Sequence, residues 1–355
     1  MPGASDLAAL ALALVDIPSV SRSEAALTDW IAEFVASSCP SMSVRHRQAD
    51  AIVFGPPGPV DVVIAGHSDT VPVQGNLPGR VADGCVHGLG ASDMKGALAV
   101  MLALAAGLER TAAPTLRPLF VVFGREELPL AESVLAGLFT SCPSILEARL
   151  AVMMEPTANR IEAGCQGNVK AEVVFSGVAA HSARPWLGVN AIHEAVRGLR
   201  AMADGEPHDV TLDGLTFREV ASVTEIAGGV ANNVIPDRVR CGLNFRYAGS
   251  RTPEDAEARL RALLGPPGAD SLTIVSNAPG APVNLDNPLL RRLRDVAGTT
   301  VRPKQAWTPV AEFATHGLDA INLGPGDPDL AHKRDERVAV EALSASLDIL
   351  RRFLA

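Results

Sequence analysis

Histidine, aspartate and glycine residues gather in two short segments, which read GHSDTVP at 66–72 and GASDMKG at 90–96. His67 and Asp69 are two residues apart, so their side chains point to the same side of an extended chain. A metal-ligating histidine binds the cation through one ring nitrogen and donates from the other to an acceptor that fixes the ring. The spacing is typical of a metal ligand with its orienting carboxylate, and also of a histidine satisfied at the end of a strand.

Further side chains of the metal-ligand type stand at the ends of apolar, strand-like runs: Glu126, Glu127, Glu155 and His332. Carboxylates in such places are costly to bury without a compensating charge. Together with the two segments above, they are enough for two divalent ions that share one bridging carboxylate. For His332 alone, an exposed loop histidine is the alternative, because Lys-Arg-Asp-Glu follows it.

The adjacent pair Glu126 and Glu127 suggests two different tasks. Neighbouring side chains on a strand or turn diverge, so we expect one carboxylate to ligate a metal while the other faces an open coordination position. A carboxylate beside a water of lowered pKa is able to take its proton and pass it on. A solvated acidic turn is the alternative reading of this pair.

Buried strands alternate with amphipathic helices in the first part of the chain, which predicts an α/β catalytic domain with a mainly parallel sheet. In such sheets, ligands bind beyond the carboxyl ends of the strands, where the acidic residues stand. We expect strands at 44–52, 60–65, 119–123 and 150–154, and helices at 5–16, 24–37 and 94–108.

The pattern changes near Lys170, where residues 171–175 alternate in the way of a half-exposed antiparallel strand. The order strand-helix-strand-strand-helix-strand predicts a small inserted α+β domain, and APGAP at 278–282 is typical of a return linker. The sequence therefore predicts a catalytic domain at 1–170, an inserted domain at 171–280 and the rest of the catalytic domain at 281–355. In the inserted domain, we expect strands at 221–226, 239–245 and 272–275, and helices at 191–202 and 253–264. In the second part of the catalytic domain, we expect a strand at 320–323 and helices at 289–296 and 338–353.

Composition excludes several classes of protein. The 355 residues carry 31 Lys and Arg against 40 Asp and Glu, a net charge of −9, with no basic patch of the kind that binds nucleic acid. No apolar run reaches the roughly 18 residues that a membrane span needs. Five cysteines without a close pair are typical of a reducing compartment. The apolar run at 7–15 lacks the flanks of a signal peptide, so we expect a cytoplasmic protein.

From about residue 7 to the C-terminus, the chain resembles the dinuclear zinc peptidase and deacylase family that includes aminoacylases and acetylornithine deacetylase. Seven blocks in the family's order carry the resemblance: GHSDTVP, GASDMKG, REEL, MMEPT, AHSARPWLGVNAI, GGVANNVIPD and GPGDPDLAHKRDE. The resemblance implies a zinc-peptidase-like catalytic domain and an inserted ferredoxin-like domain that serves as lid and dimerisation surface. It also implies two Zn²⁺ per chain, for which Co²⁺ substitutes.

The resemblance assigns metal ligands residue by residue. His67 and Glu155 hold one ion, Glu127 and His332 hold the other, and Asp93 bridges both. It also implies a cis peptide bond directly after the bridging aspartate.

The resemblance also assigns the catalytic groups. Glu126 is the general acid and base, and Asp69 orients the histidine ligand. His181, from the inserted domain, crosses a dimer interface and donates to the oxygen that develops charge; a loop histidine that caps backbone is the alternative. Arg125 departs from the acidic residue often found at its position.

Substrate contacts are expected at Arg184, Asn233, Arg246 and Gly324. The two arginines are candidates for binding a substrate carboxylate, with surface ion pairs as the alternative. The resemblance implies hydrolysis of a small N-acyl amino acid, with a succinyl group as the expected acyl part. The alternatives are another N-acyl-amino-acid deacylase, a dipeptidase or carboxypeptidase of the family, or a non-catalytic metal-binding protein on this fold.

Overall fold

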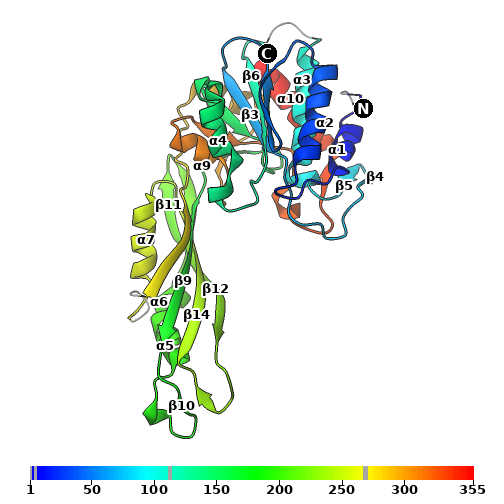
Figure 1. The fold of residues 1–355 in the computed structure, drawn as a ribbon. Helices are drawn as coiled ribbons and strands as arrows, with labels where there is room; N and C mark the ends of the chain where they lie inside the picture. The colour runs from blue at the N-terminus through cyan, green and yellow to red at the C-terminus, as the bar shows by residue number, and fades with distance from the viewer. Residues whose placement is uncertain (1, 4–5, 111–113, 267–270) are drawn as a thin grey trace. The chain divides into compact units, whose positions relative to one another are not determined.

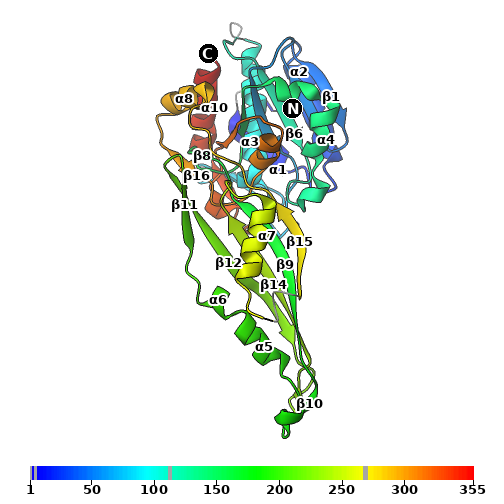
Figure 2. The same ribbon diagram turned by 90° about the vertical axis from the view of Figure 1, so that its left-hand side faces the viewer.

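The computed structural model describes residues 2–3, 6–110, 114–266 and 271–355. The chain forms two compact units, each drawn in Figures 1 and 2. The first unit contains Met1–Ala163, Asn284–Arg302 and Pro309–Ala355, and the second contains Gly164–Val283 with Pro303–Thr308. The segment 171–280, which the sequence predicts as an inserted domain, falls within the second unit.

The first unit is built on an eight-stranded sheet in the order β1-β2-β6-β3-β7-β17-β8-β16. The four neighbours β6, β3, β7 and β17 are parallel. Strands β2 and β8 pair antiparallel with β6 and β17, and β1 pairs antiparallel with β2. All carboxyl ends of the parallel strands therefore meet at one edge. The strands are β1 (Ser43–Gln48), β2 (Ala51–Gly55), β3 (Val62–His67), β6 (Pro118–Phe123), β7 (Leu150–Met153), β8 (Ile161–Ala163), β16 (Val301–Pro303) and β17 (Ala320–Asn322).

Helices cover both faces of this sheet, as Figure 1 shows, with α4 and α9 on one side and α1, α2, α3 and α10 on the other. A smaller sheet in the order β18-β5-β4 accompanies it. The remaining elements of this unit are α1 (Leu7–Val15), α2 (Ala25–Ser38), β4 (Arg80–Ala82), β5 (Cys85–His87), α3 (Gly96–Leu108), α4 (Val134–Ser141), α8 (Pro288–Ala297), α9 (Val310–Thr315), β18 (Arg337–Ala339) and α10 (Val340–Leu354).

Helix α3 is the core helix of the first unit, because every residue from Gly96 to Gly107 is buried. Among the described residues, Ala91–Leu108 is the single helical run with the length and apolar composition of a membrane span. From the sequence, we expected no apolar run of that length. Asp93 and Lys95 interrupt its apolar residues, and 89% of the run is buried inside the protein. Burial against the sheet and neighbouring helices accounts for its composition.

Several predicted boundaries are wrong for identifiable reasons. Residues 44–52 were expected as one strand, but they form parts of two strands joined by a tight turn at 49–50. The turn was missed because no glycine or asparagine marks it. The helix expected at 94–108 begins as a π-turn over Ala91–Lys95, and α3 starts at Gly96. The helix expected at 191–202 ends at Gly198, and a separate short helix starts at Arg200.

The second unit contains a five-stranded antiparallel sheet in the order β11-β12-β14-β9-β15. In β9, every second residue is buried, and these residues pack with α5 and α7 in one core. The elements are β9 (Gly167–Ser176), β10 (Ala180–His181), α5 (Ala191–Gly198), α6 (Arg200–Ala203), β11 (His208–Leu212), β12 (Leu215–Gly228), β13 (Val234–Ile235), β14 (Arg238–Tyr247), α7 (Pro253–Ala262) and β15 (Leu272–Ala278).

Candidate metal centre

Six side chains of the metal-ligand type meet at the carboxyl edge of the parallel strands of the first unit. His67 is the last residue of β3, and Glu155 follows the end of β7 by two residues. Glu126 and Glu127 follow β6. Ligand-type atoms from this set lie within 4.8 Å of one another in three overlapping groups. The metal cluster, as we call it below, consists of His67, Asp93, Glu126, Glu127, Glu155 and His332.

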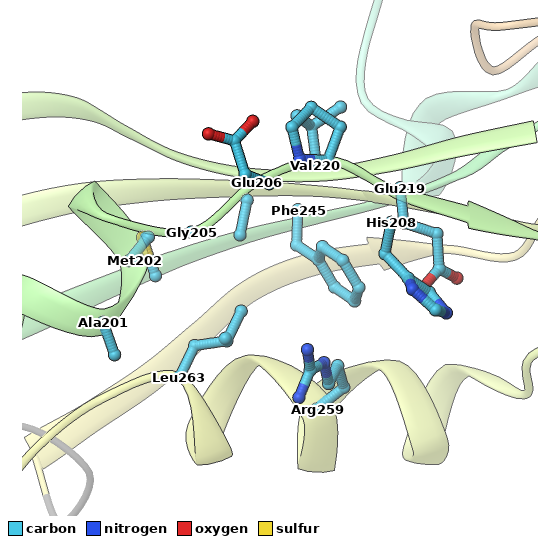
Figure 3. A pocket seen from close by; sticks show the side chains of 12 residues that line it. Ala201, Met202, Gly205, Glu206, His208, Glu219, Val220, Phe245, Arg259 and Leu263 are labelled. Atoms are coloured by element: carbon cyan, nitrogen blue, oxygen red, sulfur yellow. The ribbon is translucent and has the colours of Figure 1, made fainter.

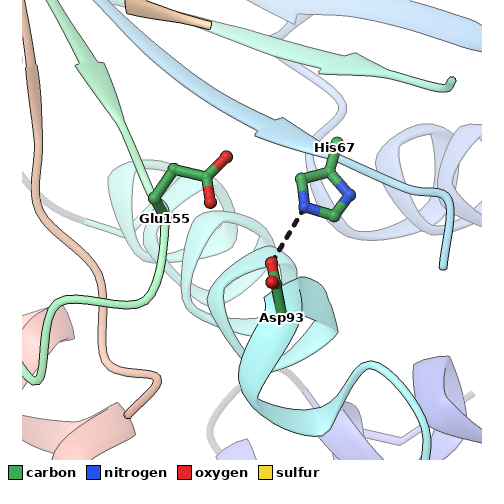
Figure 4. Close-up of side chains that lie close together, drawn as sticks. All are labelled: His67, Asp93 and Glu155. Carbon is green, nitrogen blue, oxygen red and sulfur yellow. Dashed lines mark hydrogen bonds and ion pairs between the residues drawn. The ribbon is translucent and has the colours of Figure 1, made fainter. Parts of the chain in front are cut away.

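The first group joins His67, Asp93 and Glu155, which point toward one another in Figure 4. His67 Nε2 is 3.0 Å from Asp93 Oδ1. On the other side of the ring, Nδ1 is 3.0 Å from the backbone oxygen of Asp69 and 3.5 Å from its carboxylate. The nearer carbonyl is the better acceptor for Nδ1–H, so Asp69 orients the ring chiefly through its backbone. The Asp93–Met94 peptide is cis, as the sequence analysis expects.

The carboxylate of Asp69 instead fixes the loop that carries Glu126 and Glu127. Its two oxygens accept the backbone N–H groups of Glu126 (3.0 Å) and Glu127 (3.2 Å), and it also accepts from the hydroxyl of Ser21 (2.7 Å). The expected divergence of the two glutamates is wrong, because an oxygen of each lies within 4.8 Å of the other and of His67. The loop is not an extended strand here: Arg125 has a φ of 62°.

Arg125 itself turns away from these two carboxylates. Its guanidinium lies 2.8 Å from Asp50, and its backbone N–H donates to Glu24 (3.2 Å). Its positive charge is therefore paired at the β1–β2 turn.

His332 completes the third group with Asp93 and Glu127. Its Nε2 lies 2.9 Å from Glu127 Oε1 and 3.6 Å from Asp93 Oδ2. The side chain is half exposed, and its backbone φ of 62° lies in the left-handed region, which few residues other than glycine adopt. Asp93 thus faces the histidines of two different groups.

Burial and crowded charges shift the protonation of the cluster. Burial raises the pKa of Glu126 well above its usual value, and the charge of Glu155 raises it further. Burial lowers the pKa of His67, but its contacts with Asp69 and Asp93 outweigh this and raise the pKa well above the usual value. The hydrogen bond to Glu127 raises the pKa of His332 to about 9. Each of these shifts favours the protonated form of the group.

The donor set fits two divalent cations of the zinc type. Imidazole nitrogen and carboxylate oxygen are common zinc ligands, and the histidines lie in separate groups that share Asp93. A bridging carboxylate between two ions requires this arrangement. His67 and Glu155 are buried, whereas His332 is half exposed, which leaves the cluster open on one side.

The other expected site residues lie apart from this cluster in the sequence. His181, on β10, is exposed and pairs in register with Val234 of β13. Asn233 accepts the backbone N–H of Ser182 (2.9 Å), so the two loops lie together. The N–H of Arg184 donates to the carbonyl of His181 (2.8 Å). These residues belong to the second unit and are brought together there.

Arg246 and Gly324 occupy more enclosed positions. Arg246, on β14, is partly buried, which lowers the pKa of its guanidinium. Gly324 belongs to the first unit, and a Cβ there would lie 2.2 Å from the backbone oxygen of Met154 and 2.5 Å from that of Glu155. Only glycine fits so close to the segment that positions Glu155.

A pocket of about 280 Å³ lies within the second unit, bordered by α6, β12 and α7 (Figure 3). Phe245, Met202 and Leu263 contribute apolar surface, and His208 and Arg259 contribute polar groups. None of the residues that line it is an expected site residue.

Sequence reasoning missed two buried carboxylates that hold the loops of the cluster. Glu24 accepts the N–H groups of Arg22 and Arg125, and nothing in the sequence around it signals this role. Glu336 accepts three N–H groups of the turn that bears Asp93. Its position in the block with His332 was the available signal.

Comparison with known proteins gives the same family as the sequence resemblance, over nearly the whole chain. Residues 63–355 match the model of peptidase family M20/M25/M40. A protein named succinyl-diaminopimelate desuccinylase DapE in Mycobacterium tuberculosis strain H37Rv is 41% identical over 97% of this chain and 97% of its own. A succinyl-diaminopimelate desuccinylase of Corynebacterium glutamicum is 38% identical over 96% of this chain and 94% of its own.

Solved structures share the fold at lower identity. The aminopeptidase PepT of Bacillus cereus has a TM-score of 0.80 and 19% identity, covering 99% of this chain and 98% of its own. The YXEP protein of Bacillus subtilis, described as a dinuclear metal-binding peptidase, has a TM-score of 0.70 and 16% identity, covering 99% and 97%. At this identity, the likeness establishes the fold alone. From the family match and the near full-length relatives, the chain belongs to peptidase family M20/M25/M40.

Proposed function

We propose that this protein hydrolyses the amide bond of N-succinyl-LL-2,6-diaminopimelate and releases succinate and LL-2,6-diaminopimelate, a step of diaminopimelate and lysine biosynthesis. The observation that carries the proposal is the identity of 41% and 38%, over nearly the full chain, to proteins with this activity in their names. The metal cluster supplies the chemistry that such a reaction needs.

Two Zn²⁺ per chain, replaceable by Co²⁺, fit the cluster. His67 and Glu155 would hold one ion, Glu127 and His332 the other, and Asp93 both, which agrees with the groups that the side chains form. Such a centre supplies a water of lowered pKa and polarises the amide carbonyl. The chain's own residues then have to orient the substrate and move protons.

Glu126 is the proposed general base and acid. It takes a proton from the attacking water as the C–O bond forms, and delivers it to the amine nitrogen as the C–N bond breaks. Burial and neighbouring carboxylates raise its pKa in the metal-free protein, which favours a group able to hold a proton. Asp69 supports it by fixing the backbone of the loop on which it stands.

His181 is the proposed donor to the oxygen that becomes negative during the attack. Its Nδ1 accepts the N–H of Ala183 (3.0 Å), so in the neutral ring the proton is on Nε2. That tautomer presents an N–H donor to solvent or to a substrate, because the side chain is exposed. A donor of this kind contributes about 3 kcal/mol to stabilising a transition state.

A homodimer formed through the second unit would bring His181 to the cluster of its partner. Among the described residues, β11 pairs with residues 215–219 of β12, and on that side of β12 residues 220–228 have no strand partner, although they pair with β14 on the other side. Val223 and Ile226 on this edge, and Val196 on α5, are exposed. An edge of this length with apolar side chains is a template for pairing with a second copy. The opposite edge strand, β15, exposes only Val275 among its large apolar residues.

Recognition of the succinyl carboxylate requires a cation. Arg184 and Arg246 are the candidates, with Asn233 and Gly324 as further contacts. Arg246 is partly desolvated, so an anionic partner would stabilise its charge. A second candidate function, a deacylase or dipeptidase of the same family, would use the same metal cluster, so a panel of substrates has to separate the two. The biosynthetic role favours a cytoplasmic location, and the net charge of −9 disfavours a nucleic-acid partner.

Glu126→Gln and Glu127→Gln should separate proton transfer from metal binding. The first variant keeps the metals and loses turnover by at least about 10²-fold, because the amide is unable to accept the proton. The second loses metal, because Glu127 contacts His332 in the same ligand group. Metal content by atomic emission and kcat at saturating zinc are the measurements. Equal metal content in the two variants would contradict this division of roles.

Ile226→Lys should produce a monomer that binds zinc and turns over substrate poorly, because a charge on the β12 edge prevents pairing. The matched control is Val275→Lys at the opposite edge, since Ile226 and Val275 are 61% and 67% exposed. Light scattering and kcat are measured together. A monomeric variant with full activity would place His181 outside the partner's site.

Amine release from succinylated, acetylated and dipeptide substrates tests the proposed substrate. The wild-type protein should prefer N-succinyl-LL-2,6-diaminopimelate. Arg184→Leu should reduce kcat/KM for succinyl substrates about ten- to a hundredfold and leave acetyl hydrolysis nearly unchanged, because one charge-assisted bond is lost. Arg200→Leu, an exposed arginine of the same unit, is the control. A preference of the wild type for acetyl or dipeptide substrates would overturn the proposed substrate and leave the metal chemistry standing.

A further inference from the structure

The carboxylate of Glu336 is buried against the turn that bears Asp93. Its Oε1 accepts the backbone N–H groups of Ser92 (3.0 Å) and Asp93 (2.9 Å), and its Oε2 accepts that of Gly90 (3.0 Å). The residue is 2% exposed, so water does not compete for these donors. One side chain thus fixes three of the four backbone positions from Gly90 to Asp93.

This turn lacks the hydrogen bonds of a regular helix. Asp93 and Met94 have non-helical dihedral angles (φ −126° and −136°) within the π-turn. The first N–H groups of any helix have no acceptor within that helix. Buried N–H donors without an acceptor are costly in free energy. The Glu336 carboxylate supplies the acceptor oxygens that the backbone does not.

Further contacts join the turn to the segment that bears His332. The carbonyl of Glu336 accepts the N–H of Gly88 (3.0 Å), and the hydroxyl of Ser92 donates to the carbonyl of Asp327 (2.9 Å). The segment 327–336 is therefore hydrogen-bonded to the turn through both of its ends, and it carries His332 of the metal cluster. A shift of Glu336 would move an aspartate that belongs to two ligand groups.

We infer that Glu336 is a positioning residue that sets the place of Asp93, and through it the affinity of both metal ions. The inference rests on the proposed dinuclear function. Residues that orient metal ligands typically change metal affinity or activity by 10- to 100-fold when they are replaced. A residue that served stability alone would change neither affinity.

Glu312, on α9, offers a matched control. It is 6% exposed, and its carboxylate accepts from the hydroxyl of Ser133 at 2.9 and 2.7 Å. It belongs to the first unit and to none of the ligand groups. Replacing it removes a buried carboxylate of the same type without touching the turn of Asp93.

The test compares Glu336→Gln, Glu336→Asp and Glu312→Gln. Metal-free proteins are titrated with Zn²⁺ against a chromophoric chelator, and the absorption spectrum of the Co²⁺ form is recorded. Glutamine keeps the size of Glu336 but has one acceptor oxygen, so it is unable to serve both Gly90 and Asp93. We expect both metal affinities to fall 10- to 100-fold with an altered Co²⁺ spectrum, and kcat at saturating zinc to fall while KM stays within about twofold.

Glu312→Gln should keep both affinities and the wild-type Co²⁺ spectrum, even where its melting temperature changes. Glu336→Asp, which retains the charge on a shorter stem, should lie between wild type and Glu336→Gln. If either folded variant of Glu336 binds both ions as the wild type does, the positioning role is overturned. Failure of the wild type to bind a second ion would instead refute the proposed dinuclear function.

Discussion

Repulsion between carboxylates at one edge of the sheet is the constraint on which the first unit depends. Two like charges 4.8 Å apart, the spacing within the ligand groups, repel by about 3 kcal/mol at an effective dielectric constant of about 20. Four acids converge here; contacts with neighbouring carboxylates raise the pKa values of His67 and His332, and burial and the charge of Glu155 raise the pKa of Glu126. Divalent cations would relieve the repulsion between the acids and convert it into affinity.

The surrounding structure keeps the acids together against this repulsion. Parallel pairing of β6, β3, β7 and β17 brings the ends of four strands to one edge. Carboxylates outside the ligand groups then fix the loops through backbone N–H groups, as Asp69 does for Glu126 and Glu336 does for Asp93. The buried helix α3 supports the turn that precedes it.

Sequence alone predicts what depends on local pattern. The local pattern named His67, Glu155 and His332 as candidate ligands at the ends of apolar runs, and the resemblance assigned the bridging role of Asp93. The two-strand hairpin at 43–55 was missed because its turn lacks glycine. The role of the Asp69 carboxylate in holding the loop of Glu126, and the whole role of Glu336, were missed because they depend on contacts 57 and 243 residues apart in the chain. The place of Glu336 in the block that carries His332 was the one signal that the sequence offered for these roles.

Calorimetric titration of the metal-free protein with Zn²⁺, in buffers of different ionisation enthalpy, tests the central claim most directly. Because the pKa of His332 is about 9, its ring carries a proton at pH 7 that must leave when a cation binds. We expect two ions per chain, with proton release at pH 7 that declines as the pH rises through about 9, and affinity that rises over the same range. Binding of a single ion, or of two ions without proton release at pH 7, would contradict the account.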